Sequence, residues 1–443
     1  MRHTTAILAA LLFCAAYGAR AQAAKYDLAA YIQSVEAHNR DLKLARRDID
    51  SAEQTRREAL AALLPNLGLQ GGYTRNLVDI SQPQPVYAVG PVNGVYPLVY
   101  QNVVTSFDNT YSIAGGVNFS LFNLQAAANY RQAREGRRAT ATAYDYRREV
   151  ILNAARKLYF QTLLLGKVVD VKKASERNAR ESYENIKLKF DAGLATRLDE
   201  LMAEVDWKGK IPELAEARRD YELALMNLKS LAGIDSGEEV ELTQSMDRYP
   251  ELPADVSLDQ ALAARPDYEL LLRQKKLSEL AVQGAMAAFF PTVGGSFNAS
   301  YQDMTGNSAG AADYKPFALQ LGLTVNLPVY AGGYRAAKLA AEKIDGDKNA
   351  IALAKKREDV RTELASDRLR LTEARSRIDS AALLVDAAQK AYDQASLSLK
   401  SGMVTQVQLS QASLGLEGSR IQYYSAVYEY LAATFDWELA VGQ

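Results

Sequence analysis

The chain has 443 residues, of which 48% are hydrophobic and 24% charged, and its formal net charge at pH 7 is -1. This near balance excludes the strong positive charge that draws a protein to nucleic acid. Cys14 is the only cysteine and there are two histidines, so disulfide frameworks, thiolate catalysis and Cys/His metal sites are excluded as well.

The first 21 residues have the pattern of a cleaved secretory signal peptide. Arg2 precedes an apolar run over 6–16, and the small-residue site Ala19-Arg20-Ala21 follows it. The residue before Cys14 is a large phenylalanine, which does not suit lipid attachment. No later stretch reaches the roughly 18 uninterrupted apolar residues that a membrane helix needs. We therefore expect a secreted chain whose residues 1–21 are removed, without a membrane helix.

The remaining chain consists of two copies of one unit. Residues 117–122 (VNFSLF) return as 325–330 (VNLPVY), and residues 190–196 (FDAGLAT) return as 399–405 (LKSGMVT). Because such pairs keep their order along the chain, they indicate a duplication rather than chance similarity. The expected organisation is a first repeat at 22–233, an equatorial linker at 234–257 and a second repeat at 258–443.

Each copy contains two segments with the alternation of membrane strands. In the first segment, Leu67, Leu69 and Tyr73 alternate with Gly68 and Gln70. A period of two predicts a strand with one apolar face and one small, polar face. Each segment has about the 9 to 11 residues that a tilted membrane strand needs. The expected strands are about 66–75, 110–121, 292–301 and 316–328.

A seven-residue apolar repeat predicts that the other segments are long helices packed as coiled coils. It runs, for example, through Leu364, Leu371, Ile378 and Val385. Proline inside a helix removes a backbone donor and should kink or restart it. The expected long helices are about 124–189 and 334–400, the shorter ones about 27–62, 197–232, 258–289 and 406–440, and the prolines concerned are Pro212 and Pro266.

These elements predict a mainly α fold with a membrane β-barrel part. The strands lie between the first short helix and the long helix of each copy, so all four emerge at the same end. Four strands cannot close a barrel, lipid does not tolerate an open edge, and known barrels start at about eight strands. The sequence therefore predicts an oligomer, with a coiled-coil cylinder of helices below a shared barrel.

Several short motifs occur in a fixed order along the two copies. They are Arg265-Pro266-Asp267, Leu64-Pro65, Phe290-Pro291, Asn118-Phe119-Ser120-Leu121-Phe122 and Gly193-Leu194-Ala195-Thr196. With these motifs the chain resembles the TolC family of outer membrane efflux proteins, over essentially the whole mature sequence. The resemblance implies a homotrimer with a twelve-stranded barrel in the outer membrane of a Gram-negative bacterium and a helical tunnel in the periplasm. It also implies outer-membrane lipid, a periplasmic adaptor and, indirectly, an inner-membrane pump as partners.

The same resemblance implies functional positions where the helices reverse. Glycine suits such a reversal because it tolerates positive φ, although it also simply ends helices. Some family members close the tunnel with acidic residues where this chain has Gln408 and Gln411, so a polar but neutral constriction is expected. Asp199 of the first copy occupies the position that matches Gln408. We expect its negative charge, in the first turn of a helix, to interact favourably with the helix dipole rather than to gate the tunnel. The tips expected to contact the adaptor are Gly193, Leu194, Ala195 and Thr196, and Gly402, Met403, Val404 and Thr405.

Two alternatives to an export duct come from other classes of protein. A secreted periplasmic coiled-coil spacer would fold the alternating segments into a soluble sheet. A hydrolase on a helical scaffold lacks a site, because the mature chain has only one histidine, His38, and no cofactor motif. The proline-rich segment 76–109, with Tyr87, Tyr96 and Tyr100, is expected as an external loop that binds a ligand or phage or plugs the mouth. The cargo and the pump are not encoded in any motif.

Overall fold

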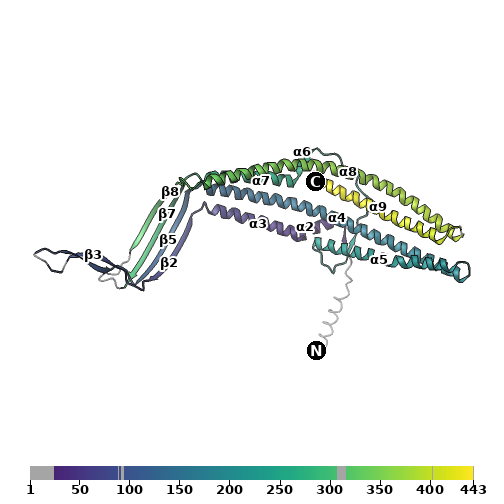
Figure 1. Ribbon diagram of the computed structural model, residues 1–443, viewed down its shortest axis with the longest axis horizontal. Coiled ribbons are helices and arrows are strands. Elements are labelled where there is room, and N and C mark those ends of the chain that lie inside the picture. Colours follow the sequence, from purple (N-terminus) through teal and green to yellow (C-terminus); the bar gives the residue numbers. More distant parts are fainter. Residues whose placement is uncertain (1–23, 88, 91–93, 307–315, 402, 443) are drawn as a thin grey trace, which may run out of the picture. The chain divides into compact units, whose positions relative to one another are not determined.

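The computed structural model describes residues 24–87, 89–90, 94–306, 316–401 and 403–442 (Figure 1). The predicted signal peptide and Gly402 lie outside these residues. The chain is mainly helical with a smaller β part, which confirms the expected fold class. It divides into a helical unit, comprising residues up to Asp50 with 139–272 and 351–443, and a sheet unit, comprising 51–138 and 273–350.

The helices appear in the same order in both repeats. The two longest, α4 and α8, contain 68 and 67 residues, as the sustained heptads predict. α5 continues through Pro212. The first repeat contains α2 (Leu28–His38), α3 (Arg40–Ala61), α4 (Leu124–Asp191) and α5 (Arg197–Ala232), and the second contains α6 (Leu258–Ala264), α7 (Pro266–Ala287), α8 (Tyr334–Lys400) and α9 (Gln406–Val441).

The first short helix is broken at Asn39, where the sequence analysis predicts one helix over 27–62. The side-chain oxygen of Asn39 accepts from the backbone N–H of Leu42 at 3.0 Å, which caps α3. Its amide nitrogen donates to the carbonyl oxygen of Leu231, near the end of α5, at 3.0 Å. The prediction of a continuous helix is wrong because one side chain serves two helix ends here.

The second repeat is broken in the same way at Arg265. α7 restarts at Pro266, as predicted, and Arg265 Nη1 donates to the carbonyl oxygen of Ala440 in α9 at 2.9 Å. α9 then ends in the left-handed Gly442, with φ 78°. A Cβ at Gly442 would lie 2.7 Å from the backbone of the last residue of α6. Glycine is therefore needed both for the positive φ and for the close approach.

The sheet unit contains a four-stranded antiparallel sheet in the order β2-β5-β7-β8. β7 is four residues longer than the sequence analysis predicts, and β8 ends two residues earlier, before Pro328. β1 and β6 form a separate parallel pair in the helical unit. The strands are β1 (Ala24–Tyr26), β2 (Asn66–Arg75), β3 (Ser81–Tyr87), β4 (Leu98–Val104), β5 (Asn109–Phe122), β6 (Val240–Leu242), β7 (Thr292–Thr305) and β8 (Phe317–Asn326).

The segment 76–109, expected as a loop, contains the antiparallel hairpin β3–β4. Thr105 donates its backbone N–H to the carbonyl oxygen of Ile80 at 2.8 Å, so even-numbered residues of β3 pair with β4. Pro83 and Pro85 are odd-numbered, and their nitrogens face the outer edge of β3. The loop prediction is wrong because both prolines occupy positions that need no donor.

The core of the helical unit is built around buried tyrosines whose hydroxyls hold irregular segments. Tyr159 donates to the carbonyl oxygen of Tyr26 in β1 at 2.8 Å, and Tyr430 donates to the carbonyl oxygen of Pro250 at 3.0 Å. Both rings are fully buried. A buried hydroxyl needs a partner, so these bonds fix the segments around 24–26 and 234–257 against the helices.

An ion pair next to the second helix break predicts a loss of stability in acid. Asp267 lies 2.7 Å from Arg265 and 2.7 Å from Lys356. Burial alone would raise the pKa of Asp267, but hydrogen bonds from these two cations outweigh it and lower the pKa to about 2. A lowered pKa stabilises the fold above the pKa of the unfolded chain, and this stability is lost as pH falls through the folded value.

We expect Asp267→Asn to lower the thermal midpoint at pH 7 and to flatten its dependence on pH between about 4 and 2. The cost at neutral pH is about 1 to 3 kcal/mol, as for hydrogen bonds to charged groups. Asp259→Asn, which removes an exposed ion pair with Arg357, is the control and should change little. Equal midpoints for both variants would show that the pair at Arg265 does not stabilise the fold.

Candidate functional site

The four-stranded sheet has one face that is apolar in every strand. The register places Leu67, Val117, Phe297 and Leu321 directly opposite one another across the four strands. Directly opposed residues point to the same face, so each such row is continuous. Leu321, in the middle of β8, is 83% exposed. The neighbouring rows on this face contain Leu69, Gly115, Ala299 and Leu319, and Gly71, Ile113, Tyr301 and Phe317.

The opposite face of the sheet is small and polar. Gly68, Gly116, Asn298 and Gln320 form one of its rows. Gly116 leaves room for the Asn298 side chain, because an added Cβ would lie 2.2 Å from its oxygen and Asn298 would have to turn aside. Other rows contain Asn66, Asn118, Ser296 and Gly322, and Gln70, Ala114, Ser300 and Ala318. The predicted separation of apolar and polar faces thus holds across all four strands.

The apolar face ends in aromatic residues at the end of the sheet away from the helices. The ring centroids of Tyr73 and Tyr111 are 4.9 Å apart, and the Tyr73 hydroxyl donates to Asn109 at 2.9 Å. The row before them contains Tyr301 and Phe317. Rings with a polar tip favour the boundary between lipid and water, so this edge of the face has the composition of a membrane boundary.

The first helix reversal, between α4 and α5, is a tight turn with capped ends. Gly193 has φ 74°, and Leu194 donates its N–H to the carbonyl oxygen of Lys189 at 2.7 Å, as expected for a helix that ends in a left-handed glycine. Thr196 and Asp199 then form a reciprocal capping box at the start of α5. Asp199 therefore caps the helix in addition to placing a negative charge in its first turn. Leu194, at the tip of the turn, is 79% exposed.

The second reversal, between α8 and α9, repeats this geometry among the described residues. Met403 donates its N–H to the carbonyl oxygen of Ser398 at 2.9 Å, the same spacing as in the first turn. Thr405 and Gln408 form the capping box of α9, in which Gln408 Oε1 accepts from the Thr405 N–H at 2.9 Å. Gln408, expected at a constriction, thus caps the helix, while Gln411 lies exposed one turn further on.

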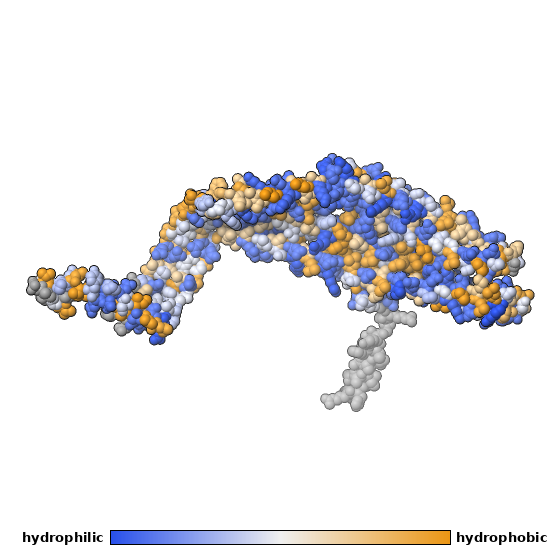
Figure 2. Space-filling view, viewed as in Figure 1, coloured by the Kyte–Doolittle hydropathy of each residue, from blue (hydrophilic) through white to orange (hydrophobic). Residues whose placement is uncertain are grey.

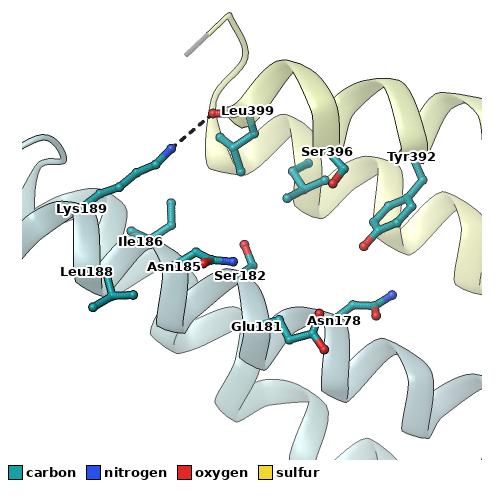
Figure 3. A pocket seen from close by; sticks show the side chains of 11 residues that line it. Asn178, Glu181, Ser182, Asn185, Ile186, Leu188, Lys189, Tyr392, Ser396 and Leu399 are labelled. Carbon is teal, nitrogen blue, oxygen red and sulfur yellow. Dashed lines mark hydrogen bonds between the residues drawn. The ribbon is translucent and has the colours of Figure 1, made fainter. Parts of the chain in front are cut away.

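A cleft of about 490 Å³ lies between the two reversals in the helical unit (Figure 3). Lys189 of α4 reaches across it and donates to the carbonyl oxygen of Leu399 in α8 at 3.5 Å. Ser182 of α4 and Gln406 of α9 are also hydrogen-bonded, at 3.1 Å. The lining residues are Asn178, Glu181, Ser182, Asn185, Ile186, Leu188, Lys189, Tyr392, Ser396, Leu399 and Leu409.

Further along the same helices, a buried group of charges joins three of them. Glu417 of α9 accepts from Lys210 of α5 at 2.9 Å, from Ser175 of α4 at 2.6 Å and from Lys172 of α4. Lys172 also donates to Glu213 of α5 at 2.6 Å. The side chains of Lys210 and Glu417 are 6% and 8% exposed. We call these five residues the Glu417 cluster.

Electrostatics keeps Glu417 charged within this cluster. Burial alone would raise the pKa of Glu417, but hydrogen bonds from Lys172, Ser175 and Lys210 outweigh it, and the pKa lies below its usual value. For Lys172, burial alone would lower the pKa, but its bonds to Glu213 and Glu417 raise it. Glu417 belongs to the second repeat and its partners to the first, so the cluster fastens the two repeats together beside their tips.

The sequence was compared with models of known protein families. The family model described as outer membrane efflux protein matches residues 31–234 and 257–443. The chain belongs to this family. The matched segments leave out most of the region between α5 and α6. The family consists of outer membrane channel proteins and not of enzymes, which confirms the class inferred from the sequence and places the chain in the outer membrane.

Individual family members resemble the chain at low identity. It is 21% identical over 317 residues to the alkaline protease secretion protein AprF of Pseudomonas aeruginosa, covering 71% of this chain and 66% of AprF. It is 24% identical over 325 residues to the toluene efflux pump outer membrane protein TtgC of Pseudomonas putida, covering 72% of this chain and 62% of TtgC. The matched part thus spans slightly less than two thirds of these relatives.

A solved structure of the family shares the fold. The CmeC outer membrane channel of Campylobacter jejuni superposes with a TM-score of 0.76 at 17% identity, covering 94% of this chain and 85% of CmeC. Within the described ranges, no helix is long and apolar enough to cross a membrane. The same residues contain no group of three or more His, Cys, Asp or Glu side chains arranged to hold a metal ion.

Sequence reasoning missed the Glu417 cluster and the capping role of Gln408. A signal for the second existed, because Thr followed three residues later by Gln is a capping-box pattern. The cluster had only a weak signal, namely Lys172 with Ser175 and Lys210 with Glu213, each pair three residues apart on one helix. Nothing in the sequence placed Glu417 beside them.

Proposed function

We propose that three copies of the chain form a channel through the outer membrane, which conducts substrates delivered by a periplasmic adaptor and an inner-membrane pump. The carrying observation is the four-stranded sheet with one continuous apolar face and two open edges. Among the described strands, β2 and β8 each have a single partner in the sheet. Lipid does not tolerate open edges, so the sheet needs further strands from other copies.

The strand directions support closure of the barrel by identical copies. Neighbouring strands of the sheet are antiparallel, so β2 and β8 run in opposite directions. β8 of one copy can therefore pair antiparallel with β2 of the next, and repetition of this contact closes a ring. Three copies supply twelve strands, which exceeds the smallest known barrels of about eight. The polar face then lines a water-filled lumen.

The helical unit supports the same assembly through apolar side chains that a single chain leaves exposed. Leu198, Leu201 and Val205 follow one face of α5 at helical spacing, and Val205 is 72% exposed. Figure 2 shows such hydrophobic residues among charged ones at the tips of α5 and α9. Exposed apolar stripes of this kind mark helix contacts, so neighbouring copies would cover them. The alternative function, a soluble periplasmic coiled-coil spacer, would leave the apolar face of the sheet exposed to water.

The tips are where the channel would meet its adaptor and open. Leu194 and Met403 are exposed at the two reversals, as an adaptor contact requires, and the exposed Gln411 would line a neutral constriction. Between the reversals, Lys189–Leu399 and Ser182–Gln406 hold the two helical hairpins together. Opening would separate the tips and break these bonds.

A reducible cross-link between the tips tests this opening. We expect Lys189→Cys with Leu399→Cys, joined by a short disulfide-containing bis-maleimide, to abolish export, and reduction of the linker to restore it. Export is measured as retention of a fluorescent efflux substrate by cells that carry the chain with its own adaptor and pump. Cys14, the only native cysteine, lies in the predicted signal peptide and does not interfere.

The control is Arg180→Cys with Glu184→Cys, a pair one turn apart on α4. A link within one helix places no constraint between helices, so export should continue. Unchanged export by the cross-linked Lys189/Leu399 variant would contradict opening at the tips. Loss of export by both linked variants would attribute the effect to the reagent.

A further inference from the structure

The β3–β4 hairpin is an uncharged and unsupported part of the sheet unit. No Asp, Glu, Lys, Arg or His occurs between Asp79 and Asp108, in a chain whose charged fraction is 24%. Among the strands that the structure describes, β3 and β4 pair with each other and with no third strand, and an isolated two-stranded hairpin is marginally stable in water. Tyr87 and Tyr100 are 72% and 75% exposed. The hairpin therefore requires a neutral, partly apolar cover.

The base of the hairpin is tied to the end of the sheet that lies away from the helices (Figure 1). Asn76 Nδ2 donates to the carbonyl oxygen of Phe107 at 2.8 Å, and Ser106 Oγ accepts from the Ile80 N–H at 3.0 Å. The helices join the other end, since β2 follows α3 and β5 precedes α4. The hairpin thus continues the sheet beyond its aromatic rows.

The two faces of the hairpin differ in chemistry. The register opposes Pro85 to Tyr100 and Tyr87 to Leu98 on one face, which we call the Tyr100 face. On the other face Gln84 opposes Gln101, while Gln82 opposes Val103 and Val86 opposes Val99, so that face mixes amides with valines. Tyr87, Leu98 and Tyr100 are each more than half exposed, whereas Val86 and Val103 are half-buried and Val99 is 43% exposed. The Tyr100 face therefore presents more exposed apolar side chains and is the one to be covered.

We propose that the hairpins of the three subunits pack their Tyr100 faces against one another and cap the external end of the barrel. This inference rests on the proposed trimeric channel. Around a three-fold axis each residue meets its own copies, and a charged side chain would face like charges. A segment without charged residues can pack against its own copies around such an axis without this repulsion.

The prolines decide how the hairpins meet. A closed ring of strands would pair the outer edge of β3 with the outer edge of β4 in the next subunit. Pro83 and Pro85 lack the N–H groups on that edge, and proline at an edge blocks strand addition. The cap is therefore held by side-chain packing alone, and it can open without unzipping a sheet.

Cross-linking tests whether the Tyr100 faces meet. Leu98→Cys and Val99→Cys are neighbours on β4 with opposite faces, and both positions are exposed. In the full-length protein in membranes, a short bis-maleimide should convert Leu98→Cys into covalent dimers and leave Val99→Cys monomeric on a denaturing gel. Equal cross-linking of the two variants, or none of Leu98→Cys, would overturn the cap.

Access to the lumen tests whether the cap closes the mouth. Ser300→Cys places a thiol on the polar face of β7, and its labelling by a maleimide joined to a bulky polyethylene glycol is followed in intact cells. We expect Tyr100→Asp, which brings like charges together, to accelerate this labelling several-fold, and Gln101→Asp on the opposite face to leave it unchanged. Equal rates in the two variants would overturn the cap.

A small maleimide separates this inference from the function on which it rests. If the channel exists, the small maleimide should label Ser300→Cys from outside whether the hairpin carries Tyr100→Asp or not. The reagent is small enough to pass gaps in a cap that is held by side chains. Absence of labelling by the small reagent in every variant would overturn the proposed lumen, and with it the cap. Labelling by the small reagent together with equal rates for the bulky one overturns the cap alone.

Discussion

Leu321→Arg is expected to prevent stable insertion of the protein in the outer membrane, whereas Gln320→Arg is expected to be tolerated. Leu321 lies in the middle of β8 on the apolar face, and Gln320 is its neighbour on the polar face. Arginine facing lipid at the middle of a bilayer costs about 2 to 4 kcal/mol in a barrel, and a trimer contains three copies of it. Arginine in the lumen remains in water.

The measurement is the amount of each variant in the outer-membrane fraction, with heat-resistant oligomer on a gel as a second readout. Both substitutions add the same charge to the same strand, so differences in synthesis or secretion cancel. Normal insertion of Leu321→Arg would contradict the assignment of this face to lipid. A defect confined to Gln320→Arg would reverse the two faces.

Glu417→Leu is expected to destabilise the helical unit by about 3 to 5 kcal/mol, the usual cost of breaking a buried ion pair from one side. Lys210, which is 6% exposed, would lose its buried carboxylate partner and keep only the 3.5 Å contact with the more exposed Glu213. The triple variant Lys172→Met, Lys210→Met and Glu417→Leu should recover most of the loss, because apolar side chains of similar volume replace a buried ion pair at little cost.

Thermal unfolding in detergent measures both variants, and Glu429→Ala is the control. Glu429 pairs with Arg377 between α9 and α8, but this pair is nearly half exposed, so its loss should cost less than about 1 kcal/mol. A Glu417→Leu midpoint close to that of Glu429→Ala would show that the cluster does not fasten the repeats. A triple variant as unstable as the single one would mean that packing, not charge, is decisive.

The parts of this fold that the sequence predicts are those with a local period. Alternation at Leu67, Leu69 and Tyr73 identified the strand and its faces, and the spacing of Leu364, Leu371 and Ile378 identified a long helix. Such patterns are readable because each residue's orientation follows from its position along a regular element.

The parts that the sequence analysis missed depend on partners that are distant along the chain. Asn39 breaks a helix because Leu231 lies beside it, and Glu417 is buried because two helices of the other repeat bring lysines to it. The β3–β4 hairpin was missed for a different reason. Proline normally argues against a strand. Pro83 and Pro85 are tolerated because they lie two residues apart and both face the unpaired edge of β3, which the sequence alone does not reveal.

Native mass measurement of the protein extracted from the outer-membrane fraction tests whether identical chains complete the barrel. We expect the protein to require detergent for extraction and to have three times the mass of the signal-processed chain. A monomer recovered from the soluble periplasmic fraction would contradict the barrel and favour the coiled-coil spacer.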